Sequence, residues 1–221
     1  PDAFTKDFLI THFFNPPRYM RLLEIVTGPN TGKDAVAAID EFCDVKLGKH
    51  VIHAKDTPGF IANRIGGMWM QAAIQAAFDL GLSVEEADAI MGRPFGMPRT
   101  GVFGLLDLVG LDLMPQVAAS MQRTLPKSDL YLTTMKDRPL LTKMIADGYT
   151  GRKGKGGFYR LDRKPDGSRV KEGIDLATGQ YRASDRPSLA SANERDPAKI
   201  LQAPDRGGQY ARRVLAYTLQ Y

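Results

Sequence analysis

The segment from Gly59 to Leu80, GFIANRIGGMWMQAAIQAAFDL, constrains the fold most strongly. It is apolar on nearly every side at helical spacing, and a helix of that kind is buried at the centre of a helical domain. Asn63, Arg64, Gln71 and Gln75 interrupt it, whereas a membrane span needs about 20 predominantly apolar residues without such charges. The segment therefore predicts the core helix of a soluble protein, with no membrane span.

The 56 residues before this segment have a different pattern. FLITHFF (8–14), LLEIV (22–26) and KHVIHAKD (49–56) have the composition of strands, and residues 31–48 have apolar side chains at helical spacing. The order strand, strand, helix, strand suits the end of an α/β domain. The prolines of NPPRYM enforce a turn after the first strand. If that turn centres near Pro17 and Arg18, paired positions sum to about 36, and His12 faces Glu24.

Helix signals dominate from residue 56 to about residue 148. Pro58 suits the first turn of the long helix, with Asp56 or Thr57 as its cap. Ser83 and Glu86 have the spacing of a capping box, which predicts a second helix. After a loop over 92–101, residues 102–125 resume a helix that we expect to be kinked near Pro115. A last short helix covers 138–148 and is ended by a glycine.

The remainder of the chain is rich in turns. GYTGRKGKGGFYRL (148–161) is a basic glycine-rich loop that leads into a strand, and the DG pair at 166–167 predicts a hairpin tip. A linker and a short helix follow, and YARRVLAYTLQY (210–221) begins another helix. We therefore expect three parts: 1–55, 56–160 and 161–221.

Composition narrows the classes of function. The net charge of +5 fits anionic small molecules as readily as nucleic acid, and the charge is not gathered in one run, so nucleic acid is not expected as a partner. The single cysteine, Cys43, excludes an internal disulfide framework and is interpreted as an inert core thiol. No signal peptide is visible, and we expect a cytoplasmic location. His50 and His53 alternate to opposite faces of a strand, so a shared metal is not expected.

Four features could carry chemistry. His12 could act as a general base oriented by Glu24, although a structural histidine and a solvated glutamate would leave the same pattern. Asn63 places an amide in an apolar helix, where it must find partners, either a substrate carbonyl or local backbone groups. Asn15 could be a turn residue only. The glycines and cations of GRKGKGG could contact phosphate, or form a flexible connector, which is the reading we favour.

Taken in order, HFFNPP, LLEIV, KDTPGFIANRI, FGLLDLVGLD and GRKGKGGFY resemble the 3-hydroxyacyl-CoA dehydrogenase family over residues 8–160. The resemblance implies a mainly α fold: terminal β-strands of a Rossmann-like NAD-binding domain, then an all-helical domain of the 6-phosphogluconate-dehydrogenase C-terminal type, which commonly forms a homodimer. The final segment, from residue 210, resembles the first helix of the second helical copy found in multifunctional fatty-acid oxidation proteins.

The resemblance also implies roles. His12 matches the catalytic histidine that takes the proton of the 3-hydroxyl while hydride passes to NAD, and Glu24 matches its carboxylate partner. Asn63 matches the asparagine that binds near the reacting acyl group of the acyl-CoA substrate. Asn15 matches the asparagine beside the nicotinamide, and Lys153 matches a lysine that reaches the cofactor. The sequence departs from the family where Gly154 replaces a threonine or serine.

The family's dinucleotide loop, ribose-binding acid and active-site serine all precede the histidine motif, and no G-x-G-x-x-G follows a strand here. We therefore expect a fragment of an NAD-dependent (S)-3-hydroxyacyl-CoA dehydrogenase of β-oxidation that, as given, binds NAD poorly and turns over slowly or not at all. Two alternatives remain open: a non-catalytic helical dimerisation module, and a related enzyme such as a 3-hydroxybutyryl-CoA dehydrogenase.

Overall fold

The computed structural model describes residues 2–164 and 166–221. These fall into two compact units, one that extends to Ile65 and one that covers Gly66–Tyr221. They are called unit 1 and unit 2 below, and each is described by itself.

Unit 1 is a small α/β unit. Its elements are α1 (Asp2–Thr5), β1 (Leu9–Phe13), β2 (Leu22–Thr27), α2 (Lys33–Glu41), the π-helical turn η1 (Phe42–Lys46) and β3 (His50–Ala54). The sheet has the order β1-β2-β3, with β1 and β2 antiparallel and β2 and β3 parallel. The parallel pair needs a crossover, and α2 with η1 supplies it. Leu23, Ile25 and Cys43 form the core, which confirms the expected burial of the cysteine.

The register of the first hairpin agrees with the sequence-based expectation. Leu9 pairs with Thr27, and His12 pairs with Glu24, so that the numbers of partners sum to 36. The prediction that these two residues face each other is confirmed.

The long central helix starts later than the sequence suggested. Helix α3 covers Ala62–Leu80. Gly59 has φ of 75° and Phe60 has φ of 47°, both in the left-handed region, so residues before Ala62 form a turn. The expectation that Pro58 lies in the first helical turn, capped by Asp56 or Thr57, was therefore wrong.

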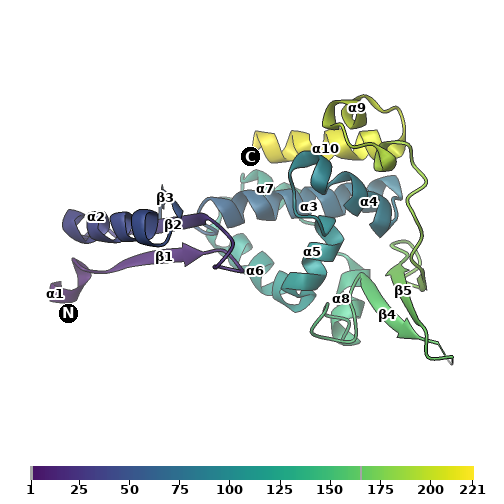
Figure 1. Cartoon of the computed structure of the whole chain (residues 1–221), viewed down its shortest axis with the longest axis horizontal. Coiled ribbons are helices and arrows are strands. Elements are labelled where there is room, and N and C mark those ends of the chain that lie inside the picture. The colour runs from purple at the N-terminus through teal and green to yellow at the C-terminus, as the bar shows by residue number, and fades with distance from the viewer. Residues whose placement is uncertain (1, 165) are drawn as a thin grey trace. The chain divides into compact units, whose positions relative to one another are not determined.

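Unit 2 is mostly helical (Figure 1). After the body of α3, its helices are α4 (Val84–Ile90), η2 (Arg93–Phe95), α5 (Gly101–Val109), η3 (Leu111–Leu113), α6 (Met114–Thr124), α7 (Leu130–Thr134), α8 (Pro139–Ala146), η4 (Ser191–Asn193), α9 (Pro197–Gln202) and α10 (Arg206–Gln220). Ser83 and Glu86 form the predicted capping box at the start of α4. The core gathers Trp69, Phe103, Phe158 and Tyr210 from segments far apart in sequence.

The expected kink near Pro115 was wrong. Helix α5 ends at Gly110, which has a φ of 108° that only glycine adopts readily. The chain bends by 78° at this point, between α5 and the segment formed by η3 and α6. Pro115 lies instead in the first turn of α6, where its missing N–H costs nothing. Among the described residues, no single helix is long and apolar enough to span a membrane. Within the described chain, only α5 taken together with the segment Leu111–Thr124 has the required length and composition, and that pair is bent.

A small antiparallel sheet completes unit 2. Its strands are β4 (Tyr159–Arg163), β5 (Arg169–Ile174) and β6 (Tyr181–Ala183), in the order β4-β5-β6. The hairpin predicted at 166–167 is confirmed by the pairing of β4 with β5. Strand β6 and helix α7 were not predicted; β6 has only three residues, and α7 only five.

Candidate active site

The turn between β1 and β2 is fixed by a lysine. Lys49 is only 7% exposed, and its ammonium donates to the carbonyl oxygens of Pro17 and Met20, the latter at 2.8 Å. A buried ammonium needs such acceptors, so the contact fixes the Asn-Pro-Pro turn against β3. The sequence analysis did not identify Lys49, because no spacing rule links it to a turn 30 residues earlier.

His12 and Glu24 form a hydrogen-bonded pair across β1 and β2. The Nδ1 of His12 lies 2.6 Å from Oε2 of Glu24. The Glu24 side chain is fully buried, and that of His12 is 27% exposed. A short bond from a buried carboxylate fixes both the ring orientation and the tautomer, leaving the proton on Nδ1 in the neutral ring.

The other oxygen of Glu24 holds the start of α3. Oε1 accepts the backbone N–H of Ile61 at 3.0 Å and that of Ala62 at 2.8 Å. The first N–H groups of a helix have no partner inside the helix and carry partial positive charge, so a carboxylate is stabilised there. Both oxygens of Glu24 are thus occupied, and its position is set by the sheet and the helix together.

The other ring nitrogen of His12 is available for chemistry. Nε2 makes no hydrogen bond to any residue that the structure describes. The ring packs against Phe14, with centroids 4.6 Å apart, and edge-on to Phe60 at 5.6 Å. These two aromatic rings restrict rotation of the His12 ring and shield it from water on two sides. The arrangement can take a proton at Nε2 and stabilise the resulting imidazolium through Glu24.

The two asparagines are exposed. Asn63 follows the Glu24-bound residues in the first turn of α3, and its side chain makes no hydrogen bond to another described residue. The expectation that its amide must find partners inside an apolar helix was wrong, because the helix is buried only from Met68 onward. Asn15 is likewise exposed, and the peptide bond between Asn15 and Pro16 is cis. Both amides are therefore free to meet a ligand.

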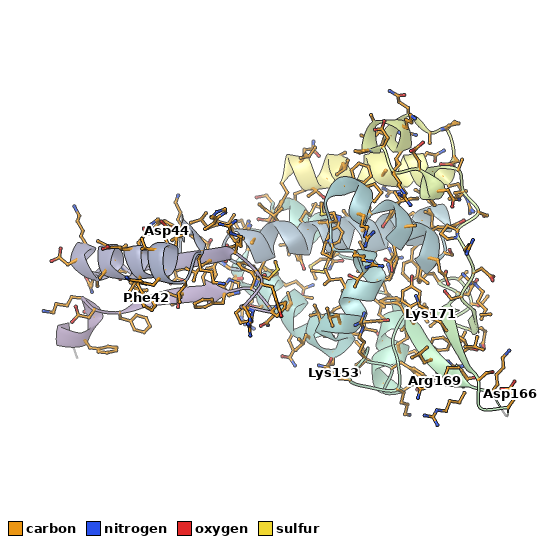
Figure 2. All side chains as sticks on the ribbon, viewed as in Figure 1. Phe42, Asp44, Lys153, Asp166, Arg169 and Lys171 are labelled. Carbon is orange, nitrogen blue, oxygen red and sulfur yellow. The ribbon has the colours of Figure 1, made fainter. Side chains whose placement is uncertain are left out.

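The glycine-rich loop carries Lys153, which Figure 2 labels in unit 2, and is anchored to α5 by hydrogen bonds. Asp107 accepts the N–H of Phe158 at 2.7 Å and that of Tyr159 at 2.8 Å through its carboxylate. Its backbone carbonyl accepts the N–H of Arg152 at 2.8 Å. The loop is thus held at both ends by one residue, in contrast to the flexible connector favoured from the sequence.

Lys153 itself points to Asp112. Its Nζ lies 2.9 Å from Oδ1 of Asp112, and the Lys153 side chain is 52% exposed. A Cβ on Gly110 would fall 2.7 Å from the Cε and Nζ of Lys153, so the absence of a side chain at Gly110 makes room for the lysine. The ammonium is held at a defined position and remains accessible to an anionic ligand.

His53 and Cys43 have other surroundings. His53 pairs with Asp40 at 2.7 Å on the outside of unit 1, and among the described residues no cluster of three histidine, cysteine or acidic side chains could hold a metal. Burial raises the pKa of the Cys43 thiol, so that less of the nucleophilic thiolate forms at neutral pH.

Two family profiles match consecutive parts of the chain. Residues 3–57 match the profile described as the NAD binding domain of 3-hydroxyacyl-CoA dehydrogenase, and residues 59–161 match its C-terminal domain.

Individual proteins give the same result. A putative fatty acid oxidation complex trifunctional enzyme of Rickettsia prowazekii is 40% identical over 82% of this chain and 25% of its own length. A probable 3-hydroxyacyl-CoA dehydrogenase of Bacillus subtilis is 33% identical over 100% of this chain and 28% of its own. The crystal structure of FadB2 from M. tuberculosis is 30% identical, with a TM-score of 0.59 over 70% of this chain and 52% of that one. The chain thus spans about a quarter of the length of these curated relatives.

Proposed function

The chain belongs to the 3-hydroxyacyl-CoA dehydrogenase family, and from that premise we propose that it carries the catalytic base and the helical domain of an NAD-dependent (S)-3-hydroxyacyl-CoA dehydrogenase of fatty-acid oxidation. The reaction converts the 3-hydroxyl of an acyl-CoA ester to a ketone. The observation that supports this most is the pair of His12 and Glu24, with Nε2 of the histidine left open.

His12 removes the hydroxyl proton. Its Nε2 accepts the proton as the carbon–oxygen double bond forms, and Glu24 stabilises the positive charge that develops on the ring. NAD, when bound, supplies the hydride acceptor. Because both oxygens of Glu24 are already bonded, the carboxylate does not have to reorganise as the charge appears.

The exposed polar groups suit the substrate and the cofactor. The amide of Asn63 is free to donate to an acyl carbonyl, close in sequence to the residues that hold Glu24. Asn15 offers an amide beside the Asn-Pro-Pro turn, and Lys153 offers a positioned ammonium on a loop whose glycines leave it room. An amide and an ammonium are donors that a dinucleotide with its carboxamide and phosphates can accept from.

The test is the reduction of acetoacetyl-CoA by NADH, followed by NADH absorbance, with the longest polypeptide that the gene encodes. We expect His12→Gln to lower kcat by about 10²–10⁴-fold, the usual contribution of a positioned general base. The fold should not change, since the His12 side chain is partly exposed on an edge strand.

His53→Gln is the matched control, because His53 also pairs with a carboxylate in unit 1, but with the partly exposed Asp40 of α2. It should keep the parental kcat. Near-normal turnover by His12→Gln would contradict the assignment of the base. Assays with acyl chains of increasing length would separate a 3-hydroxybutyryl-CoA dehydrogenase from an enzyme for longer chains.

We also propose that unit 2 forms a homodimer. Four aliphatic side chains around the bend between α5 and α6 are exposed: Leu108 by 55%, Val109 by 49%, Leu113 by 40% and Val117 by 47%. Grouped apolar exposure of this kind marks an interaction surface. A helical dimerisation module without catalysis would show this surface but would not reduce acetoacetyl-CoA, whether His12 is present or changed.

A further inference from the structure

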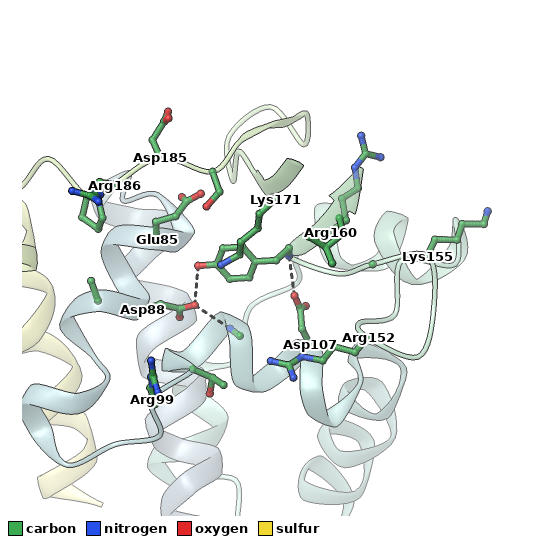
Figure 3. Close-up of a pocket in the computed structure, with 18 of the residues that line it drawn as sticks. Glu85, Asp88, Arg99, Asp107, Arg152, Lys155, Arg160, Lys171, Asp185 and Arg186 are labelled. Atoms are coloured by element: carbon green, nitrogen blue, oxygen red, sulfur yellow. Dashed lines mark hydrogen bonds between the residues drawn. The ribbon is translucent and has the colours of Figure 1, made fainter. Parts of the chain in front are cut away.

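Unit 2 contains a cavity of about 980 Å³ that the catalytic proposal does not use (Figure 3). It lies among α4, the start of α5, the glycine-rich loop, β4, β5 and the segment after β6. Its size is at the upper end of the range for small-molecule sites, about 300–1,000 Å³. Ten charged side chains line it: Glu85, Asp88, Arg99, Asp107, Arg152, Lys155, Arg160, Lys171, Asp185 and Arg186.

Three of the four acidic side chains of the cavity are already engaged in hydrogen bonds. Glu85 bonds to Arg182 at 2.8 Å, and Asp185 lies 4.0 Å from the same guanidinium. Asp88 accepts two backbone N–H groups of α5 and the hydroxyl of Tyr159. Asp107 accepts the two N–H groups at the start of β4. These bonds, some of which Figure 3 draws, occupy Glu85, Asp88 and Asp107, whereas Asp185 is 82% exposed and keeps its acceptor capacity.

Several cations of the cavity have no such partner. Arg99, Arg152 and Arg186 form no ion pair or hydrogen bond through their guanidinium groups with any described residue. Lys171 lies over the ring of Tyr159 at 4.0 Å and also lacks a carboxylate within ion-pair distance. The cavity therefore has positive charge in excess of its available acceptors.

The three arginines approach from separate segments. Arg99 precedes α5, Arg152 belongs to the glycine-rich loop and Arg186 follows β6. Figure 3 shows them on different sides of the cavity rather than in one cluster. Arginine binds phosphate oxygens in a planar, two-pronged geometry, and separated guanidinium groups suit a ligand that carries more than one phosphate.

We propose that this cavity is a binding site for a small ligand with at least two phosphate groups. The site is distinct from the lysine offered to the cofactor, because Lys153 is not among the lining residues and points to Asp112 instead. Burial raises the pKa of Asp88 to about 7, which reduces the negative charge that such a ligand meets.

Calorimetric titration of the full chain with ADP, inorganic pyrophosphate and orthophosphate tests the proposal. The triple variant Arg99→Gln, Arg152→Gln and Arg186→Gln removes the three unpaired guanidinium groups. We expect it to weaken ADP and pyrophosphate binding by at least about tenfold, since each charge-assisted bond contributes strongly to affinity. Its melting temperature should change little, because these side chains are exposed and their guanidinium groups form no hydrogen bond with any described residue, although the charge of Arg152 lowers the pKa of Asp107.

The matched control is Arg163→Gln, Arg169→Gln and Arg195→Gln, which changes net charge equally at exposed arginines outside the cavity. It should bind within about twofold of the parent. Equal weakening in both triple variants, or no binding of any probe by the parent, would overturn the site. Orthophosphate binding as tight as that of pyrophosphate would overturn the requirement for two phosphates. The test does not involve turnover, so it can fail without affecting the catalytic proposal.

Discussion

At the scale of single residues, Glu24 links catalysis to folding. Its two oxygens serve different partners: one orients His12, and the other holds the first N–H groups of α3. A glutamine at this position keeps the size but replaces one acceptor with a donor. If the amide nitrogen faces the helix N–H groups, these lose their acceptor. If it faces Nδ1 of His12 it donates there, which moves the ring proton to Nε2 and removes the base.

We therefore expect Glu24→Gln to lower kcat and to destabilise unit 1 by about 1 kcal/mol, because the first N–H groups of α3 lose either their acceptor or its negative charge. Activity assays and urea unfolding followed by circular dichroism would measure the two effects. His12→Gln separates them, since it should lower turnover without a comparable loss of stability. A Glu24→Gln protein with unchanged stability would contradict the role in holding α3.

The sequence predicted this pair but not its surroundings. The pairing of His12 with Glu24 follows from hairpin geometry. Once the turn is centred near Pro17 and Arg18, the partner of every residue in the two antiparallel strands is determined. The contacts of Glu24 with Ile61 and Ala62 join residues about 37 positions apart. No local spacing rule reaches that far, and the same holds for Lys49 and the turn that it binds.

Asp88 gives a prediction about pH. Burial raises its folded-state pKa to about 7, above the ordinary value of 3.8 that the unfolded chain has. Between these values the folded protein holds the proton and the unfolded chain does not, so the free energy of unfolding of unit 2 should fall as pH rises from about 4 to about 7 and level off above that.

Asp88→Asn should reduce this dependence, while the smaller contribution of Asp107, whose pKa is raised to about 6, remains. Urea titrations at several pH values can be followed through Trp69, the single tryptophan, which is 4% exposed in the core of unit 2. Parallel pH curves for the parent and the variant would show that Asp88 does not titrate in this window.

At the scale of elements, glycines decide where helices and loops end in unit 2. The sequence suggested a kink at Pro115, because proline is the usual helix breaker. The actual break occurs at Gly110, where positive φ is combined with the close approach of Lys153. That approach involves residues more than 40 positions away, so the pattern of α5 and α6 alone could not distinguish the two positions.

The glycine-rich loop supplies a second case and a prediction. Gly151 has φ of 107°, and a Cβ there would lie 2.3 Å from the carbonyl oxygen of Asp107. Gly151→Ala should therefore destabilise unit 2 through both backbone strain and a clash. Gly167→Ala is the control, since Gly167 has φ of 82° but nothing within 4 Å of its Cβ position. We expect Gly151→Ala to be the less stable variant by about 1–3 kcal/mol in urea titrations followed by Trp69 fluorescence. Equal losses would mean that the loop can move away from α5.

At the scale of the whole molecule, the order of motifs predicted the family better than any single element predicted its own boundaries. HFFNPP, LLEIV and TPGFIANRI each place one part of the His12 site: the base, its acid and the helix start that the acid holds. Their order and spacing are constrained together by that geometry. The sheet β4-β5-β6 and helix α7 are not constrained in this way, and short elements with polar faces leave little periodicity to detect.

The proposed dimer is the prediction that belongs to this scale. A charge placed in the centre of an apolar interface must be desolvated without a partner, so Val117→Lys should weaken self-association by about tenfold or more. Sedimentation equilibrium over a range of concentrations would measure the dissociation constant. Leu161→Lys is the matched control, because Leu161 is 67% exposed on β4, outside the bend between α5 and α6. If the parent chain were monomeric throughout that range, or if both variants weakened association equally, the exposed aliphatic side chains around Gly110 would not be the dimer surface. A dimer lost only on Val117→Lys, with the Trp69 unfolding transition unchanged, would place the interface at this bend.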